Sequence, residues 1–385
     1  MTLEVPPLGL YVHLPWCVQK CPYCDFNSHP KAEVLPEQRY VAALLHDLDQ
    51  ELNRVEGRRI ESIFFGGGTP SLFSPDAIHR LIEAVQQRFQ CAEELEVTLE
   101  ANPGAVEKGR FEGFKQAGVN RLSIGVQSFN DKHLKILGRI HSASEAIGAA
   151  EAAQHAGIAN FNLDLMYGLP GQAPGEALDD IRQAIKLQPA HISYYQLTIE
   201  PHTYFAKYPP TLPGEDQIWA LQCEAQSMLA STGYRQYEIS AYAHGGAQCR
   251  HNLNYWNFGD YLGIGAGAHG KMTNAAENTI YRSWKVAHPS EYMETAGTAK
   301  NVGRYLEIQG SDRILEFLMN GLRLNAGFEK AAMNRRIGHR LSALEPDLSD
   351  CIRAGLIEQS ETHIRCTERG RNFLDSILTR FVPET

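Results

Sequence analysis

Short apolar segments alternate with longer amphipathic segments along the first 232 residues of the chain. Six apolar runs have the length of buried strands: GLYVHLP (9–15), SIFFGG (62–67), LEVTLEA (95–101), RLSIGVQS (121–128), NFNLDLMYG (160–168) and HISYYQLTI (191–199). Segment 37–55 spaces its apolar residues by three, four or seven, as one buried helical face requires. Further helices are expected near 75–89, 106–117, 143–156, 174–187 and 215–232. This alternation predicts right-handed β/α units and an α/β fold with a parallel sheet.

Polar residues gather where the predicted strands end. Six β/α units are too few for a closed eightfold barrel, so we expect an open, partial (β/α)6 TIM-like barrel, with a doubly wound sheet as the alternative. Barrel enzymes build one site from the carboxyl ends of successive strands, and this pattern favours the barrel. The residues at these ends are His13 and the following cysteines, Gly66 to Thr69, Glu100, Gln127, Asp164, Gln196 and Thr198.

After residue 232 the pattern changes twice. Residues 233–310 are irregular, and we expect loops and short strands over the barrel mouth, in a loop-rich segment that carries the sequence HNLNYW. Residues 311–385 are mainly helical, with two short strand-like pieces around a polar turn, an outline that resembles a winged helix. Winged helices often bind DNA, but this segment holds eleven Lys and Arg residues against eleven Asp and Glu residues. A packing or lid role is therefore the preferred interpretation of this domain.

Composition excludes several classes of protein. The 385 residues carry a net charge of −9 and give a pI of 5.9, which argues against a general affinity for nucleic acid. The N-terminal sequence MTLEVPPLGL lacks the pattern of a secretory signal, and no apolar run has the length of a membrane span. Five cysteines are scattered singly, as is typical of reduced thiols. We therefore expect a cytoplasmic protein.

Three further cysteines lie close together in HLPWCVQKCPYCDFNSH, residues 13–29. Cys17, Cys21 and Cys24 follow the first strand directly, and thiolates are ligands for zinc or for iron–sulfur clusters. A structural zinc site would need a fourth ligand, for which His13 or His29 is available, but no second cysteine pair follows. The alternative is a four-iron cluster that leaves one iron open to a small-molecule chelate.

The spacing Cys-x3-Cys-x2-Cys, with Tyr23 before the third cysteine, resembles the radical S-adenosylmethionine (SAM) superfamily. That resemblance implies a [4Fe–4S] cluster whose open iron binds the amino and carboxylate groups of S-adenosylmethionine. It also implies that the predicted barrel is a radical SAM barrel, because the motif follows the first strand of a β/α series.

Other segments resemble the oxygen-independent coproporphyrinogen III oxidase (HemN-like) family within this superfamily. The resemblance covers nearly the whole chain, through GIGAGAHG (263–270) into a HemN-type C-terminal domain. GGGTP (66–70) resembles the segment that contacts the methionine amino group, through Gly67, Gly68 and Thr69. LEANPG, GVQSF and NLDLMYGLPGQ place Glu100, Gln127 and Asp164 at positions that anchor adenosine in this family. By the same resemblance, Arg139 pairs with the substrate carboxylate, and Tyr11 and Thr198 are further contacts.

Two features separate the chain from the oxidases of that family. Oxidases carry a fourth cysteine two residues after the third, where this chain has Phe26. They also have a longer N-terminal extension, for which strand one, beginning near residue 9, leaves no room. Coproporphyrinogen III oxidation is therefore the alternative function and not the preferred one.

A third feature points to haem. HNLNYW (251–256) brings together His251, Tyr255 and Trp256, and histidine can ligate haem iron while aromatic rings stack on the macrocycle. A loop that merely packs its aromatic residues would give the same pattern. In this setting, however, HNxxYW resembles the haem chaperone subgroup called HemW, which also lacks the fourth cysteine. Further candidate ligands are His202, His244 and His269.

The resemblance therefore predicts a haem chaperone with a cluster and S-adenosylmethionine at the barrel top. Its expected partners are haem and haem-acceptor proteins, with membrane-associated respiratory haemoproteins as candidates, and no nucleic acid. We expect a monomer or a dimer linked through haem or the cluster.

Overall fold

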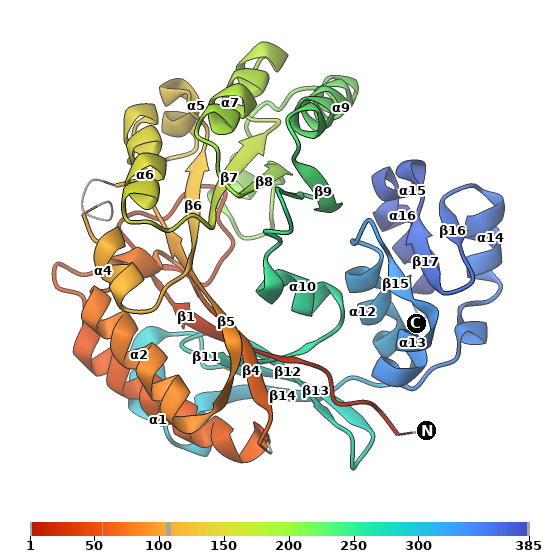
Figure 1. Cartoon of the computed structure of the whole chain (residues 1–385), viewed down its shortest axis with the longest axis horizontal. Helices are drawn as coiled ribbons and strands as arrows, with labels where there is room; N and C mark the ends of the chain where they lie inside the picture. Colours follow the sequence, from red (N-terminus) through yellow and green to blue (C-terminus); the bar gives the residue numbers. More distant parts are fainter. Residues whose placement is uncertain (1, 56, 105–108, 383–385) are drawn as a thin grey trace.

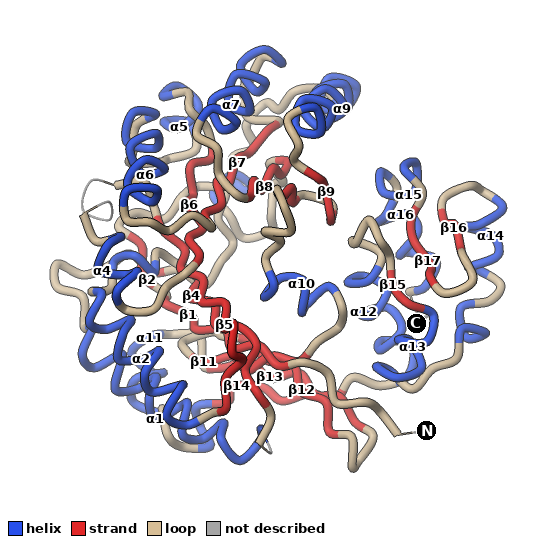
Figure 2. The backbone as a smooth tube through the Cα atoms, viewed as in Figure 1, coloured by secondary structure: helices blue, strands red, loops and turns tan. Residues whose placement is uncertain are grey.

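A computed structural model of the chain describes residues 2–55, 57–104 and 109–382. Most strands belong to one 12-stranded sheet. In spatial order, its strands are β14 (Val302–Glu307), β13 (Thr279–Lys285), β12 (His269–Asn274), β11 (Asp260–Ile264), β1 (Leu8–Leu14), β4 (Arg59–Gly67), β5 (Gln90–Ala101), β6 (Arg121–Gln127), β7 (Phe161–Tyr167), β8 (His191–Gln196), β10 (Ala241–Ala243) and β9 (Arg235–Glu238). Figure 2 shows this sheet as a continuous curved wall.

The middle of the sheet is an open β/α barrel. Strands β1 and β4 to β8 are neighbours in chain order and all pair in parallel. Six helices cover the outside of the wall (Figure 1): α1 (Glu37–Val55), α2 (Pro75–Arg88), α4 (Phe111–Gln116), α6 (Ala143–His155), α7 (Pro174–Lys186) and α9 (Glu215–Ser231). Because the order never reverses, no switch point of a doubly wound sheet exists here. The partial (β/α)6 barrel is confirmed, and residues 105–108 of the helix expected near 106–117 lie outside the described residues.

Local sequence explains where these helices begin. Ser74 caps α2 by accepting a hydrogen bond from the Ala77 amide, with Pro75 in the first turn. Ser142 and Glu145 form a capping box at the start of α6. The buried face of α2 joins the main core of the barrel, so helix ends and apolar periodicity specify the same element.

Residues 233–310 contain the expected short strands, but these strands extend the sheet at both edges instead of lying over the barrel mouth. Strands β9 and β10 continue it beyond β8, while β11 pairs in parallel with β1 and leads into antiparallel β12, β13 and β14. Sheet edges that are solvated on one face alternate polar and apolar residues, so they lack the continuous apolar runs of the central strands. The segment also contains α10 (Arg250–Trp256) and α11 (Pro289–Thr295).

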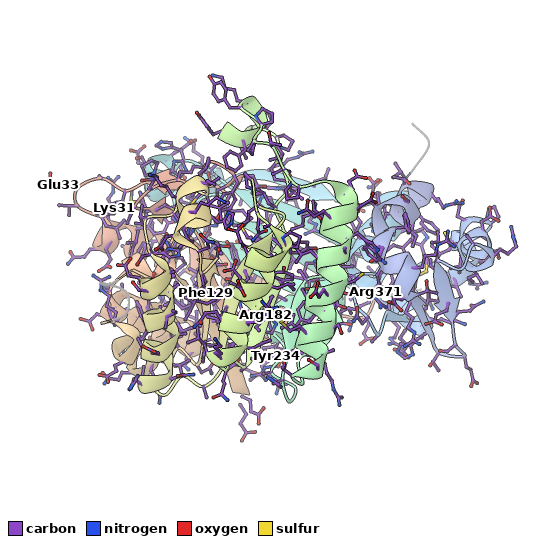
Figure 3. All side chains as sticks on the ribbon, turned by 90° about the horizontal axis from the view of Figure 1, so that it is seen from above. Lys31, Glu33, Phe129, Arg182, Tyr234 and Arg371 are labelled. Carbon is purple, nitrogen blue, oxygen red and sulfur yellow. The ribbon has the colours of Figure 1, made fainter. Side chains whose placement is uncertain are left out.

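The C-terminal region packs around its own core beside the open side of the barrel (Figure 1). A three-stranded sheet of β15 (Phe328–Glu329), β17 (His363–Cys366) and β16 (Ile357–Gln359) is surrounded by α12 (Gly310–Gly321), α13 (Lys330–Ile337), α14 (Asp347–Arg353), α15 (Glu368–Asn372) and α16 (Leu374–Leu378). The strand pair around a polar turn, followed by a helix, agrees with the winged-helix-like outline. Arg371 lies on the side that faces the barrel (Figure 3).

The remaining elements are short. They are β2 (Trp16–Cys17), β3 (His29–Pro30), α5 (Asp131–Ile136), α8 (Tyr204–Lys207) and 3-10 turns at Pro70–Leu72, Ala299–Asn301, Leu341–Leu344 and Thr379–Phe381. In the part of the chain that the structure describes, no helix has both the length and the apolar character needed to cross a membrane.

Candidate functional site

The carboxyl ends of the parallel strands surround a cavity of about 530 Å³, within the size range of small-molecule sites. Twelve of the predicted site residues line it: Cys17, Cys21, Cys24, Tyr23, Gly67, Gly68, Thr69, Glu100, Gln127, Arg139, Asp164 and Thr198. Four others, Tyr11, His251, Tyr255 and Trp256, are not among its lining residues. The structure therefore separates the predicted residues into two groups.

The cysteine loop forms one wall of the cavity. It leaves strand β2 at Cys17, and the short pairing of β2 with β3 closes its base. Lys20 Nζ donates to the Phe26 carbonyl at 3.0 Å, and the Phe205 amide of α8 donates to the Pro22 carbonyl at 3.0 Å. The chain then runs to the edge of the molecule at Lys31 and Glu33 (Figure 3). These backbone bonds present all three thiols to the same space.

The geometry around the thiols favours an iron–sulfur cluster over a zinc site. Within the described ranges, no three His, Cys, Asp or Glu side chains converge closely enough to hold one metal ion. His13 Nε2 is bonded to the Asn27 carbonyl at 2.9 Å, and His29 Nε2 to Asn27 Oδ1 at 3.1 Å, so neither ring is aimed at the thiols. In a [4Fe–4S] cluster each thiolate binds one iron, so three thiols around one cavity would ligate three of the four irons and leave one open.

The glycine segment after β4 lies flat against the first strand and its loop. Gly67 has a φ of +117°, and a Cβ there would lie 2.5 Å from the His13 ring. A Cβ on Gly68 would lie 2.6 Å from the Trp16 carbonyl oxygen. Thr69 then accepts a hydrogen bond from Asn102 Nδ2 at 2.8 Å. Glycine is therefore required at both positions by the close approach of the His13 ring and the Trp16 backbone, and both glycines line the cavity.

Two acidic side chains lie opposite the cysteines. Glu100 accepts a hydrogen bond from the Gly67 amide at 3.1 Å, and burial together with the nearby charge of Asp164 raises the pKa of Glu100 to about 8. Asp164 accepts bonds from Ser123 Oγ at 2.9 Å and Asn162 Nδ2 at 2.8 Å, while burial raises the pKa of its carboxyl. A cationic ligand in this cavity would be stabilised by both carboxylates and would lower both pKa values.

The Arg139 guanidinium lines the cavity and is held by three neighbours, one of them in the cysteine loop. It donates to Asn102 Oδ1, to the Gly125 carbonyl at 2.7 Å and toward Cys21 Sγ at 3.7 Å. Its fork is therefore largely engaged by the protein itself. Asn102 was missed in the sequence, although it lies two residues after Glu100 and bonds both Arg139 and Thr69.

Gln127 is the most unusual backbone position of the site. Its φ of +69° places a non-glycine residue in the left-handed region, which is strained and often functional. Its side-chain oxygen accepts a 2.7 Å hydrogen bond from the hydroxyl of Tyr195, a second residue that sequence reasoning missed. Thr198 lines the same cavity and donates to Glu200 at 2.7 Å. Tyr195 directly precedes Gln196, which the strand-end pattern did identify.

Tyr11 lies behind the glycine segment. Its hydroxyl is 2.9 Å from His13 Nδ1, and its ring stacks on Phe64. A Cβ on Gly66 would lie 2.9 Å from the Tyr11 ring. Tyr11 is therefore placed to support the strand that carries the cavity backbone.

The sequence HNLNYW forms helix α10, which lies on the inner side of the sheet, between the barrel and α12 (Figure 1). His251 is 1% exposed, with Nδ1 2.8 Å from Ser62 Oγ, Nε2 2.8 Å from the Tyr255 hydroxyl, and its ring stacked on Phe64. Burial lowers the pKa of His251 to about 3. We expected this segment at the barrel mouth. Instead, His251 bonds Ser62, which precedes Gly67 by five residues, or about 16 Å of strand, so the helix lies well below the mouth.

The other aromatic residues of α10 face two directions. Tyr255 packs edge-on against Tyr261 of β11 at 4.4 Å between ring centroids. Trp256 is partly buried beneath the Arg323 guanidinium, 4.4 Å from its ring, and its indole N–H has no hydrogen-bond partner among the described residues. The structure thus brings His251 and Tyr255 together and directs Trp256 toward the C-terminal region.

Known proteins resemble this chain along its whole length. Residues 11–184 match the family "Radical SAM superfamily", and residues 308–373 match "HemN C-terminal domain". The "Heme chaperone HemW" of Escherichia coli (strain K12) is 47% identical, covering 99% of this chain and all of that protein. The protein of the same name from Haemophilus influenzae is 48% identical, with 99% of each chain covered.

Among solved structures, the coproporphyrinogen III oxidase HemN of Escherichia coli, described as a radical SAM enzyme, has a TM-score of 0.83. The match covers 98% of this chain and 90% of the oxidase at 22% sequence identity. It shows that the two chains share a fold, including the C-terminal region.

Proposed function

The chain belongs to the haem chaperone HemW family of the radical SAM superfamily, and from this we propose that it binds haem and transfers it to acceptor proteins. The observation that carries the proposal is full-length identity of 47% and 48% to two haem chaperones. Phe26 adds to it, because this residue stands at the cavity where the related oxidases have a fourth cysteine, and 61% of it is exposed.

We expect a [4Fe–4S] cluster on Cys17, Cys21 and Cys24, with S-adenosylmethionine beside it in the cavity. Supporting this, the thiols share the cavity with Gly67, Gly68 and two buried acidic groups, and the acidic groups suit a ligand that carries a sulfonium and an amino group. When bound, the cluster and S-adenosylmethionine supply one-electron chemistry and a source of a carbon-centred radical. The residues of the chain orient the ligand and limit its contact with water.

The predicted haem contacts at His251, Tyr255 and Trp256 demand a change in the helix that carries them. Both imidazole nitrogens of His251 are bonded to Ser62 and Tyr255, so the ring can reach an iron only if at least one of those bonds breaks. Ligation by His251 therefore predicts that α10 opens when haem binds.

Delivery requires contact with an acceptor protein, and cytoplasmic haem-acceptor proteins or membrane-associated respiratory haemoproteins are candidate acceptors. A monomer, or a dimer linked by haem or the cluster, is the expected assembly. No basic surface is required for these roles, in keeping with the net charge of −9.

Anaerobic haem titration of the reconstituted protein tests the proposal. We expect a saturable Soret band and transfer of the bound haem to an apo-haemoprotein present in the same solution. Iron and sulfide content, measured on the same sample, show that the protein is loaded. A loaded protein without a saturable Soret band would contradict haem binding, and a bound haem that never leaves would contradict delivery.

Oxidative decarboxylation of coproporphyrinogen III is the second candidate function. It is favoured by the fold shared with the oxidase HemN and by the intact set of cavity residues, and opposed by Phe26. Incubation of the loaded protein with coproporphyrinogen III, S-adenosylmethionine and a reductant distinguishes the two. We expect no protoporphyrinogen.

A further inference from the structure

The inner face of the sheet edge carries a row of three side chains that no part of the proposed cofactor site uses. His269 of β12 lies opposite Trp284 of β13, which lies opposite Arg304 of β14. Residues directly opposite in antiparallel strands point to the same side. We call these three residues the His269 row.

The imidazole of His269 is accessible and unencumbered. The residue is exposed, in contrast to His251, and its ring makes no hydrogen bond with any described residue. It packs edge-on against Trp284, with 5.5 Å between ring centroids and 67° between ring planes. Partial burial, and then the charge of Arg282, lower the pKa of His269 and hold the ring neutral, the form that ligates metals.

Cationic and apolar groups flank this imidazole. The Arg304 guanidinium lies 5.1 Å from the Trp284 ring, is exposed, and forms no ion pair within the described part of the chain. Leu306, 45% exposed, lies opposite Arg282 in the neighbouring row of the same face. An imidazole, an indole, an aliphatic side chain and a free guanidinium are the groups that recognise an iron-bearing, apolar macrocycle with carboxylate side chains.

Helix α10 packs against this same face of the sheet, next to the row. His251 bonds Tyr255, the Tyr255 ring packs against Tyr261, and the Tyr261 hydroxyl accepts a hydrogen bond from Arg282, whose charge acts on His269. Arg282 is also paired with Glu316 of α12. The chain of contacts from HNLNYW therefore ends beside the accessible imidazole.

We infer that haem is received on the His269 row, with His269 as an iron ligand and Arg304 paired with a propionate, while His251 and Tyr255 act as positioning residues. This inference rests on the proposed haem-binding function and names its site. It requires no opening of α10, because the ligating imidazole is already exposed.

Spectroscopic haem titration of matched variants of the full-length protein, loaded with its cluster, tests the inference. We expect His269→Ala to weaken haem binding by more than about tenfold, at least as much as loss of a supporting group costs a metal site, and to shift the Soret band. Added imidazole should restore the original band. The control is His363→Ala, which removes an exposed histidine of β17 and should change nothing.

Variants at two further residues separate ligation from support. Arg304→Glu should weaken haem binding by about two- to fivefold and Arg304→Lys by less, as for an exposed ion pair. Tyr255→Phe keeps the ring but removes the bond to His251. It should lower affinity by about two- to tenfold while the iron–histidine signature in resonance Raman spectra stays unchanged.

Each outcome decides between the sites. If His269→Ala binds haem as wild type does while His251→Ala or Tyr255→Phe alters the iron–histidine signature, the His269 row is overturned and haem binding itself stands. If imidazole fails to restore the band of His269→Ala, His269 is not the ligand. If loaded wild type binds no haem, the proposed function fails together with the inference.

Discussion

The cavity at the barrel mouth and the α10 layer beneath it are both rich in polar and aromatic side chains, yet they are built in opposite ways. At the mouth, Glu100 and Asp164 border about 530 Å³ of open space. Beneath it, His251 fills its surroundings, with both nitrogens bonded and its ring stacked on Phe64. The polar side chains therefore border open space in one layer and are enclosed by bonded neighbours in the other.

Burial raises the pKa of Glu100 in the cavity and lowers the pKa of His251 beneath it, and the two shifts have different consequences. It raises the pKa of Glu100 to about 8, so the carboxyl gains from a cation that the protein does not itself supply. It lowers the pKa of His251 to about 3, so the ring stays neutral and its neighbours satisfy it. A buried polar group whose partners are incomplete indicates a binding site better than the residue type alone does.

The largest predicted effect concerns the mouth. Cys17→Ala removes one of three thiols that face one cavity, so the reconstituted variant should lose most of its iron and acid-labile sulfide. Cys223→Ala is the matched control, because Cys223 is exposed on α9, away from the cavity lining. Equal iron content in the two variants, measured after anaerobic desalting, would contradict a cluster at this site.

The next effect concerns the layer beneath. His251→Ala should lower the free energy of unfolding by about 2–4 kcal/mol, because it leaves a cavity and unpairs two buried hydroxyls, of Ser62 and Tyr255. His155→Ala, at an exposed position of α6, should stay within about 0.5 kcal/mol of wild type. Urea unfolding measures the free energy of unfolding of both variants. If His251→Ala loses no more stability than His155→Ala, the bonds of His251 do not stabilise the fold.

Sequence patterns predicted the central fold because its signals are local. Helix α1 begins and ends where the apolar spacing of 37–55 placed it, and each of the six central strands overlaps its apolar run. The bounds and pairing of the edge strands β12 to β14 were not predicted, since their alternating polar residues gave no continuous apolar run and their pairing partners lie in neighbouring edge strands. Their existence depends on tertiary pairing that a short window cannot contain.

The same distinction applies to the site. Residues at the cavity were predictable because the end of a parallel strand fixes where a side chain such as Glu100 or Asp164 must lie. The depth of His251 was not, because its bonding partner Ser62 is 189 residues away in the sequence. Asn102 and Tyr195 carried no motif of their own and became visible only through their bonds to Arg139 and Gln127.

A smaller, pH-dependent effect distinguishes the two layers again. Because the folded pKa of Glu100, about 8, exceeds its usual value of roughly 4.3, the folded protein holds a proton that the unfolded chain has lost. Stability of the ligand-free protein should therefore fall as pH rises between those values, and the loss is complete above the folded pKa. Glu100→Gln removes this term and should be more stable than wild type by about 1–3 kcal/mol at high pH.

Urea unfolding of both proteins at about pH 5 and about pH 8.5 measures this difference. Comparing the two proteins at each pH cancels the titration of groups that do not interact with Glu100, including the thiols. His251 acts in the opposite direction, because its folded pKa of about 3 lies below its usual value of about 6.5, so at about pH 5 the unfolded chain binds a proton that the folded protein does not. Its contribution to stability therefore rises with pH through about 6.5, and it is present in both proteins. A gap between wild type and Glu100→Gln that does not grow with pH would show that Glu100 is not held protonated.

The smallest expected effect is that of Phe26→Cys at the rim of the cavity. The side chain is 61% exposed, and the bonds that hold this turn use its backbone carbonyl, which accepts from Lys20 and from the Ser28 amide. Stability should change by less than about 0.5 kcal/mol. Iron content and S-adenosylmethionine affinity should also match wild type, because the three existing thiols and the cavity groups are untouched. If S-adenosylmethionine binding is lost while iron is retained, the added thiol has bound the open iron. The side chain at position 26 would then control whether S-adenosylmethionine can bind there.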